Sequence, residues 1–137
     1  MDWKNLYLSF EGRTNRQPFW LGLLAMAVVI WILEFIIFSI FGGSAMMSVD
    51  ASNPDAAAIA MSNAMSGMIV PFSILFLVFL WPSLAIYTKR WHDRDKSGWW
   101  SLIMFVPIIG GIWFLVECGF LRGTDGPNRF GDDPLGG

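Results

Sequence analysis

Three long apolar stretches constrain the fold of this 137-residue chain more than any other feature. They cover residues 19–41, 69–87 and 99–121, and each is long enough to cross the roughly 30 Å hydrocarbon core of a bilayer as a helix. Only 15% of the residues are charged, against roughly 25% in soluble domains. We therefore predict an all-α membrane protein that forms a single integral membrane domain over residues 1–137.

The distribution of Lys and Arg predicts how the chain is oriented. Lys4, Arg13 and Arg16 precede the first apolar stretch, the linker 42–68 contains no Lys or Arg, and the linker 88–98 contains four. Short cytoplasmic loops collect Lys and Arg. This pattern predicts a multi-pass protein whose N-terminus and second linker lie in the cytoplasm.

The third apolar stretch leaves two topologies open. Pro107, Gly110 and Gly111 interrupt it near its middle, where proline removes a helix hydrogen bond and glycine adds backbone freedom. The stretch is then either a kinked crossing or a re-entrant hairpin that returns the polar tail 122–137 to the cytoplasmic side. Re-entrant backbone is tolerated only when it is buried in protein, so the sequence favours three transmembrane helices with a kinked third one.

The N-terminal segment has the pattern of a short amphipathic helix. Trp3, Leu6, Tyr7 and Phe10 are spaced so that they share one face of a helix. With a lysine nearby, this pattern predicts a helix over residues 2–11 that lies in the membrane interface.

The second linker is the first candidate site, because it holds two carboxylates and the only histidine among four cations. It predicts either a structural, positively charged anchor or a site for an anionic group such as a lipid headgroup, in which His92 and Asp93 could act as an acid–base pair. One His and one Asp are too few ligands for a zinc site, so no metal site is predicted. The candidate anion-binding residues are Arg13, Arg16, Arg90, His92, Asp93 and Arg94.

Two carboxylates, Glu34 and Glu117, lie inside the apolar stretches. A charge at the bilayer centre costs about 2.5–3.5 kcal/mol on insertion scales, so each should face protein or water, or be protonated. With three crossings, both acids would lie towards the outer side and could approach each other. The alternative is that each reaches the interface or is held neutral by a hydrogen bond.

Four motifs in order along the chain carry a family resemblance. They are Phe10-x-Gly12-Arg13-x-x-Arg16-x-x-Phe19-Trp20, Arg90-Trp91-His92-Asp93 with Ser97-Gly98-Trp99-Trp100, Pro107-x-x-Gly110, and Gly123-x-x-Gly126-x-Asn128-x-Phe130-Gly131-x-Asp133-Pro134. Together they closely resemble the domain-of-unknown-function family 805, the YhaH-like small inner-membrane proteins of bacteria. The resemblance implies a bacterial inner (plasma) membrane protein with no established activity, cofactor or substrate. Trp91, where the family more often has leucine, is one departure, and the longer outer linker is another.

The polar tail contains the second candidate site. Asn128, Asp132 and Asp133 lie in a segment rich in turn-forming residues, which predicts an ordered turn. If the tail is cytoplasmic, the two aspartates could pair with Arg90 or Arg94 and close a polar clasp.

Three classes of function follow from these patterns. The leading one is a non-enzymatic membrane protein that binds a partner or anionic lipid at its cytoplasmic face. The alternatives are a transporter or channel subunit that uses Glu34 and Glu117, and an enzyme that acts on a lipid phosphate through His92 and Asp93. Besides the lipid bilayer, the expected partner is a second copy or another membrane protein; no cofactor or nucleic acid is predicted.

Overall fold

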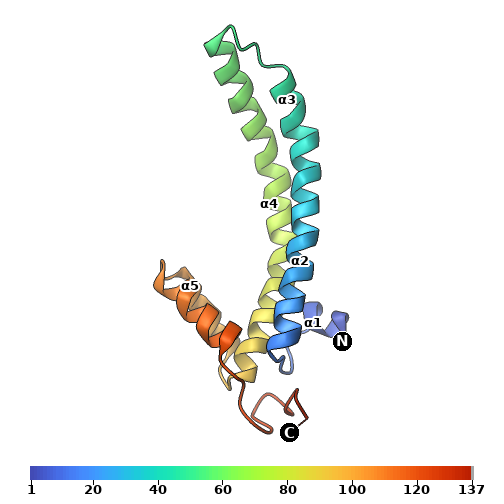
Figure 1. Ribbon diagram of the computed structural model, residues 1–137, viewed down its shortest axis with the longest axis vertical. Helices are drawn as coiled ribbons and strands as arrows, with labels where there is room; N and C mark the ends of the chain where they lie inside the picture. Colours follow the sequence, from blue (N-terminus) through green and yellow to red (C-terminus); the bar gives the residue numbers. More distant parts are fainter. Residues whose placement is uncertain (137) are drawn as a thin grey trace. The chain divides into compact units, whose positions relative to one another are not determined.

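The fold is built from helices in the computed structural model, which describes residues 1–136 (Figure 1). Those residues contain no strand, only an isolated bridge between Asn128 and Gly131. The predicted all-α class is therefore confirmed. The α-helices are α1 (Trp3–Leu8), α2 (Arg16–Ile37), α3 (Gly43–Met47), α4 (Pro54–Asp93) and α5 (Ile109–Phe114). The remaining helical segments are the π-helices η1 (Phe38–Gly42) and η3 (Leu115–Phe120) and the 3₁₀ helix η2 (Gly98–Phe105).

The chain divides into two units, and the two longest helices contribute to both. Unit 1 comprises Met1–Ala25 and Leu80–Gly137, and unit 2 comprises Met26–Phe79. All nine Lys and Arg residues of the chain belong to unit 1. Unit 2 contains three carboxylates and no Lys, Arg or His.

Helix α4 begins where the sequence supplies a start signal. The Asn53 side-chain oxygen accepts hydrogen bonds from the backbone N–H groups of Asp55 (3.1 Å) and Ala56 (3.2 Å), which have no partner within the first turn. Pro54 occupies the first helical position, where its missing N–H costs little. The helix then continues for 40 residues, which corresponds to about 60 Å at 1.5 Å per residue.

Two helices are long and apolar enough to cross a membrane by length and composition. One is the continuous helical run Arg16–Met47, which includes η1, and the other is Pro54–Asp93. The first two predicted spans, 19–41 and 69–87, lie inside them.

The third apolar stretch is a helical hairpin rather than a single helix. Its first arm, η2, ends near Pro107, whose carbonyl oxygen accepts a hydrogen bond from the Ile109 N–H at 2.7 Å. The residue between them, Ile108, has φ = 65°, so the chain reverses through a γ-turn. A Cβ on Gly110 would overlap the Ile103 carbonyl group, which explains why glycine lies where the two arms meet. Three spans with a kinked third helix are thus not confirmed.

Aromatic side chains fill the core of unit 1. Trp91 is fully buried, and its ring centroid lies 5.9 Å from that of Phe114 and 6.0 Å from that of Trp100. Phe19, at the start of α2, packs against Phe114 at 6.2 Å. The indole at position 91 therefore joins α4 to both arms of the hairpin, and Phe19 joins α2 to the second arm.

Helix α1 is shorter than the predicted 2–11, and residues of the predicted apolar stripe contact the rest of unit 1. Leu6 is buried, and the Tyr7 hydroxyl donates a hydrogen bond to the Gly22 carbonyl oxygen at 2.8 Å. Phe10 meets the ring of Trp81 edge-on at 4.8 Å. These contacts hold the N-terminal segment on the helices of unit 1.

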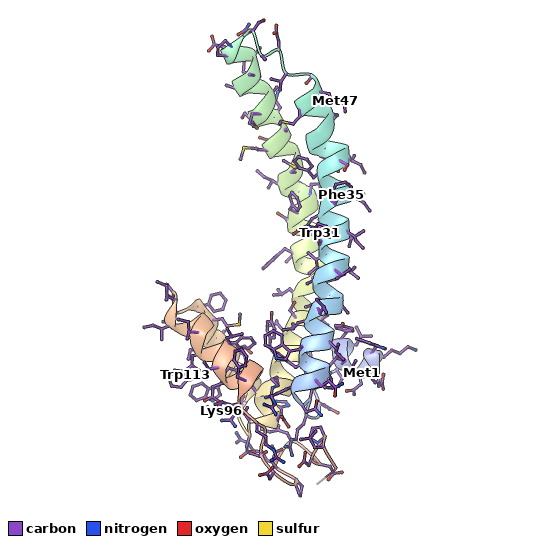
Figure 2. The ribbon with its side chains drawn as sticks, in the orientation of Figure 1. Met1, Trp31, Phe35, Met47, Lys96 and Trp113 are labelled. Carbon is purple, nitrogen blue, oxygen red and sulfur yellow. The ribbon has the colours of Figure 1, made fainter. Side chains whose placement is uncertain are left out.

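Unit 2 is a pair of helical segments with little interior. Only Met26, Gly42 and Ala64 are buried within it. Trp31 and Phe35 on α2 are largely exposed, as expected for a surface in contact with lipid (Figure 2).

Candidate functional site

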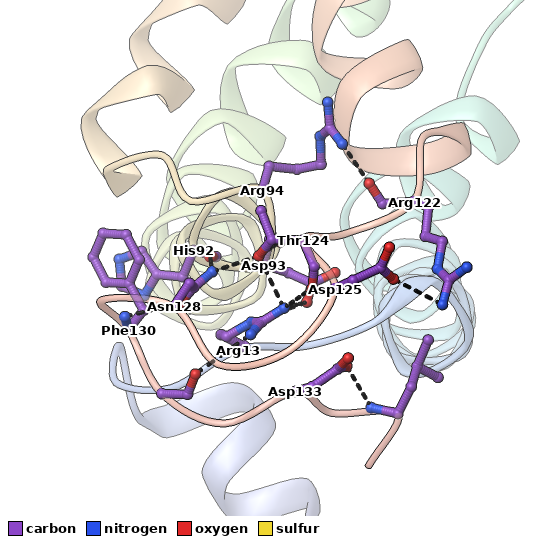
Figure 3. A network of polar contacts seen from close by, with 12 residues as sticks. Arg13, His92, Asp93, Arg94, Arg122, Thr124, Asp125, Asn128, Phe130 and Asp133 are labelled. Carbon is purple, nitrogen blue, oxygen red and sulfur yellow. Dashed lines mark hydrogen bonds and ion pairs between the residues drawn. The ribbon is translucent and has the colours of Figure 1, made fainter. Parts of the chain in front are cut away.

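A buried carboxylate, Asp93, lies at the centre of the polar residues of unit 1 (Figure 3). Arg13 donates to its Oδ1 through Nε at 3.2 Å and Nη2 at 3.1 Å, and Arg90 donates to its Oδ2 through Nη1. The side chains of Arg13, Arg90 and Asp93 are at most 3% exposed. Because each carboxylate oxygen faces a guanidinium group, the charges are paired where they are buried.

The remaining donors of Arg13 bind the C-terminal tail. Its guanidinium group donates to the carbonyl oxygens of Thr124 at 2.6 Å and Gly126 at 2.7 Å. Three segments far apart in the sequence, around residues 13, 90 and 124, are thereby joined. We call Arg13, Arg90, Asp93, Thr124 and Asn128 the polar clasp.

Basic and indole side chains also satisfy the carbonyl groups at the end of the hairpin. The last turn of a helix leaves carbonyl oxygens without helical partners. Arg90 donates to Cys118 O and Leu121 O, Trp20 donates to Gly119 O at 3.1 Å, and Arg16 donates to Phe120 O at 3.0 Å. Much of the predicted basic site therefore fixes the second arm of the hairpin to α2 and α4.

The tail in turn donates hydrogen bonds to backbone carbonyl groups at the C-terminal end of α4. The Thr124 N–H donates to Asp93 O at 2.8 Å, and the Asn128 side chain donates to His92 O at 2.9 Å. Gly123 passes so close to Asp93 that a Cβ at this position would overlap the carboxylate. The tail motif is thus a cap that fits only a backbone without a side chain at position 123.

The His92 ring is held by packing. It stacks on Phe130 with a centroid separation of 3.8 Å and an interplanar angle of 5°. Its Nδ1 lies 3.0 Å from the Gly12 carbonyl oxygen, so this nitrogen carries the proton and donates it. The predicted His92–Asp93 acid–base pair is not assembled, since both Asp93 oxygens are occupied by arginines.

The two acids within the apolar stretches have different surroundings. Glu117 accepts from Arg94 Nε at 3.0 Å and from Lys96 Nζ at 2.8 Å. The hairpin therefore brings Glu117 to the basic linker. Glu34, in unit 2, forms no hydrogen bond or ion pair with the described residues.

The tail aspartates are arranged differently from the expected pairing with Arg90 or Arg94. Asp133 accepts hydrogen bonds from the backbone N–H groups of Leu135 at 2.9 Å and Gly126 at 3.0 Å. These bonds favour the ionised form and lower the pKa of the Asp133 carboxyl below its usual 3.8. Asp132 is exposed beside it.

Several residues that build the site were not among the predicted site residues. Trp20 has the position of an interfacial aromatic residue, yet its N–H caps the hairpin. Thr124 and Gly123 are turn formers, and nothing in a single sequence shows that their partner is Asp93. The useful signal is that the third stretch is interrupted by proline and glycine, because a reversal there brings residues 117–131 to the basic linker.

An apolar groove lies beside the clasp, between the N-terminal segment, α4 and η2. Its volume is about 480 Å³, and it includes Phe10, Leu84, His92, Trp99 and Leu102. This volume lies within the range of small-molecule sites.

The fold and the clasp define a small helical membrane protein whose polar residues gather in one unit. The family model described as "Protein of unknown function (DUF805)" matches residues 7–132, so the chain belongs to this family. The resemblance inferred from the four motifs is thereby confirmed.

Two relatives from Escherichia coli (strain K12) carry names that state their location. The chain is 33% identical to the inner membrane protein YhaI, over 93% of this chain and 87% of YhaI. It is 31% identical to the inner membrane protein YhaH, over 98% of this chain and 97% of YhaH. The uncharacterized protein YiiR of the same strain is 23% identical over 91% of this chain and 85% of YiiR. No solved structure matches the chain.

Proposed function

We propose that this protein is a non-enzymatic inner-membrane protein whose unit 1 binds anionic lipid headgroups at the cytoplasmic face. The observation that carries the proposal is that all nine Lys and Arg residues belong to unit 1 and that four of them are exposed. Of these four, Arg122 and Arg129 pair with aspartates, which leaves Lys4 and Arg16. Neither forms an ion pair with a carboxylate of the described residues. A headgroup phosphate would meet these two cations rather than the enclosed Arg13 and Arg90.

The proposal includes a topology. The N-terminus, the linker 94–97 and the tail lie in the cytoplasm, because cytoplasmic segments collect Lys and Arg. The third apolar stretch enters and leaves the membrane on that side as a re-entrant hairpin. The contacts of Arg94 and Lys96 with Glu117 support this arrangement, since they bring the end of the stretch back to its beginning.

The groove beside the clasp offers room for part of an acyl chain. Leu84 and Leu102 supply apolar contacts, and Thr88 and Ser97 supply hydroxyl groups. A lipid with its chain in this groove would have its headgroup at the level of the polar residues of unit 1.

The same geometry gives less support to catalysis and transport. The Asp93 oxygens and the His92 ring already have partners within unit 1, which leaves no free acid–base pair. Glu117 is bound by two cations, so it is not an open carboxylate on an ion path.

The test is a competition between lipids for the purified protein. We would titrate the detergent-solubilised protein with phosphatidylglycerol or phosphatidylcholine and count retained lipids by native mass spectrometry. Juxtamembrane cations contribute about 1 kcal/mol each, so Lys4→Ala and Arg16→Ala should each weaken phosphatidylglycerol binding about fivefold. Arg122→Ala is the matched control, because the exposed Arg122 pairs with Asp125 at 2.8 Å. Equal retention of both lipids by the unmodified protein would contradict the proposal.

A further inference from the structure

Glu34 is the one carboxylate of the α2 apolar stretch, and it is exposed on the helix surface. It lies seven residues before the end of the apolar run 19–41, or about 10 Å along a helix. Its neighbours on the same face, Trp31 and Phe38, are 71% and 48% exposed. An acid in this position faces hydrocarbon unless another molecule covers it.

Unit 2 cannot neutralise this acid. It contains no Lys, Arg or His, and Glu34 has no hydrogen-bond partner among the described residues. Acyl chains offer no hydrogen-bond donor, and acids within transmembrane segments almost always face protein or a water-filled cavity. Glu117, the other acid of an apolar stretch, already pairs with Arg94 and Lys96 of unit 1, so it needs no partner from another molecule.

A second copy of the chain meets the requirement without any cation. A twofold axis along the membrane normal places Glu34 opposite Glu34 at the same depth, because such an interface pairs the same patch on both subunits. Two neighbouring carboxyl groups can hold one proton between them, so that one donates and the other accepts. Every copy carries the same distribution of Lys and Arg, so we expect a second copy to have the same orientation in the membrane.

The rest of this helix face suits such a contact. Ala27 lies two turns before Glu34 on the same side of α2, and small residues let two transmembrane helices approach closely. Trp31 lies between them and supplies an exposed aromatic surface that can pack on the partner helix. We propose that the α2 face formed by Ala27, Trp31, Glu34 and Phe38 is a homodimer interface in which the two Glu34 carboxyl groups bond to each other.

The first test is association in liposomes, measured by energy transfer between labelled copies over a range of protein-to-lipid ratios. Interhelical polar contacts in membranes imply that Glu34→Leu should raise the ratio needed for half-maximal transfer by about threefold to thirtyfold. Glu34→Gln should keep association close to that of the unmodified protein, because two amide groups can both donate and accept. Unchanged association of Glu34→Leu, or no association of the unmodified protein at any ratio, would overturn the proposal.

The second test is disulfide formation across the interface in membranes, with Cys118 replaced by Ser. Ala27→Cys should form a cross-linked dimer under mild oxidation, whereas Val29→Cys, an exposed position on another face of α2, should not. Equal cross-linking at both positions would overturn the proposed face. These readouts do not depend on lipid binding by unit 1, so the two proposals can fail separately.

Discussion

Unit 1 and unit 2 differ in how their charged groups find partners. In unit 1, Asp93 and Glu117 each contact two cations, and the arginines also satisfy backbone carbonyl groups. Unit 2 contains no Lys, Arg or His, and Glu34 has no partner among residues 1–136. Unit 1 thus uses its polar residues to close its own fold, whereas Glu34 of unit 2 lies on an exposed helix face.

The largest effect is expected from removing the buried carboxylate. Asp93→Ala leaves the buried guanidinium groups of Arg13 and Arg90 without their shared counter-ion, and breaking a buried pair in this way costs about 3–5 kcal/mol. We expect a large loss of thermal stability in detergent. Asp95→Ala is the control, since its pair with Arg129 is exposed and should contribute at most about 1 kcal/mol. Equal melting temperatures for the two variants would show that the clasp does not stabilise unit 1.

A smaller effect is expected where the tail passes over the clasp. In Gly123→Ala the new methyl group would overlap the Asp93 carboxylate and push the tail away, a strain of about 1–3 kcal/mol. Gly111→Ala adds the same methyl group where no atom lies within 4 Å, so it should not destabilise the protein. Thermal unfolding of both variants measures the difference. The tail would not be seated on Asp93 if the two substitutions had the same effect.

An effect of about 1 kcal/mol on the free energy of unfolding should distinguish Glu117 of unit 1 from Glu34 of unit 2. Glu117→Gln removes the charge that Arg94 and Lys96 share, and these partly exposed pairs contribute about 0–1 kcal/mol each. Glu34→Gln removes no contact within the described chain, so the stability of a single copy should not change. Unfolding at a high detergent-to-protein ratio, where copies are separated, checks this. A larger loss of stability for Glu34→Gln than for Glu117→Gln would show that Glu34, and not Glu117, has the stronger contacts within a single copy.

The smallest effect concerns the pH dependence of the tail. The pKa of Asp133 is lowered in the folded protein, so its contribution to stability is present above about pH 4 and is lost as the pH falls through the folded pKa. The Gly126 and Leu135 amides that donate to it should then exchange faster with solvent. Asp133→Asn should remove this pH dependence, whereas Asp132→Asn should leave it unchanged. The measurement is the hydrogen-exchange protection of the two amides as a function of pH. Protection that does not change with pH in the unmodified protein would show that ionised Asp133 does not hold the tail.

Local signals in the sequence predicted much of the fold. The first two apolar stretches lie inside long helices, and Asn53 and Pro54 are residue types that favour a helix start where α4 begins. The third stretch was harder, because proline and glycine show that a helix is interrupted but not in which direction the chain continues. The γ-turn at Ile108 decides that direction, and a β-branched residue at positive φ is not a pattern that sequence indicates.

The sequence identified residues of the candidate site but not the contacts between them. Arg13, Arg90, Asp93 and Asn128 were all identified, and the structure brings them together. Arg90 and Asp93 are close in sequence, but the contacts that join Arg13, Arg90 and α4 to the segment after the hairpin span about 30 to 110 positions. The hairpin brings these distant residues together. For this reason the sequence could not distinguish a headgroup site from a clasp, or show that Glu117 is paired while Glu34 is not.

The polar clasp joins the C-terminal end of α4 to the C-terminal tail, so the linker 94–97 and the tail should lie on the same side of the membrane. The most direct measurement uses single cysteines at Lys96 and Arg129, with Cys118 replaced by Ser, and an impermeant thiol reagent applied to intact cells. We expect both positions to be protected in intact cells and both to react once the membrane is permeabilised. Labelling at position 129 but not at position 96 in intact cells would place the tail on the opposite side of the membrane from the linker, which is incompatible with the polar clasp.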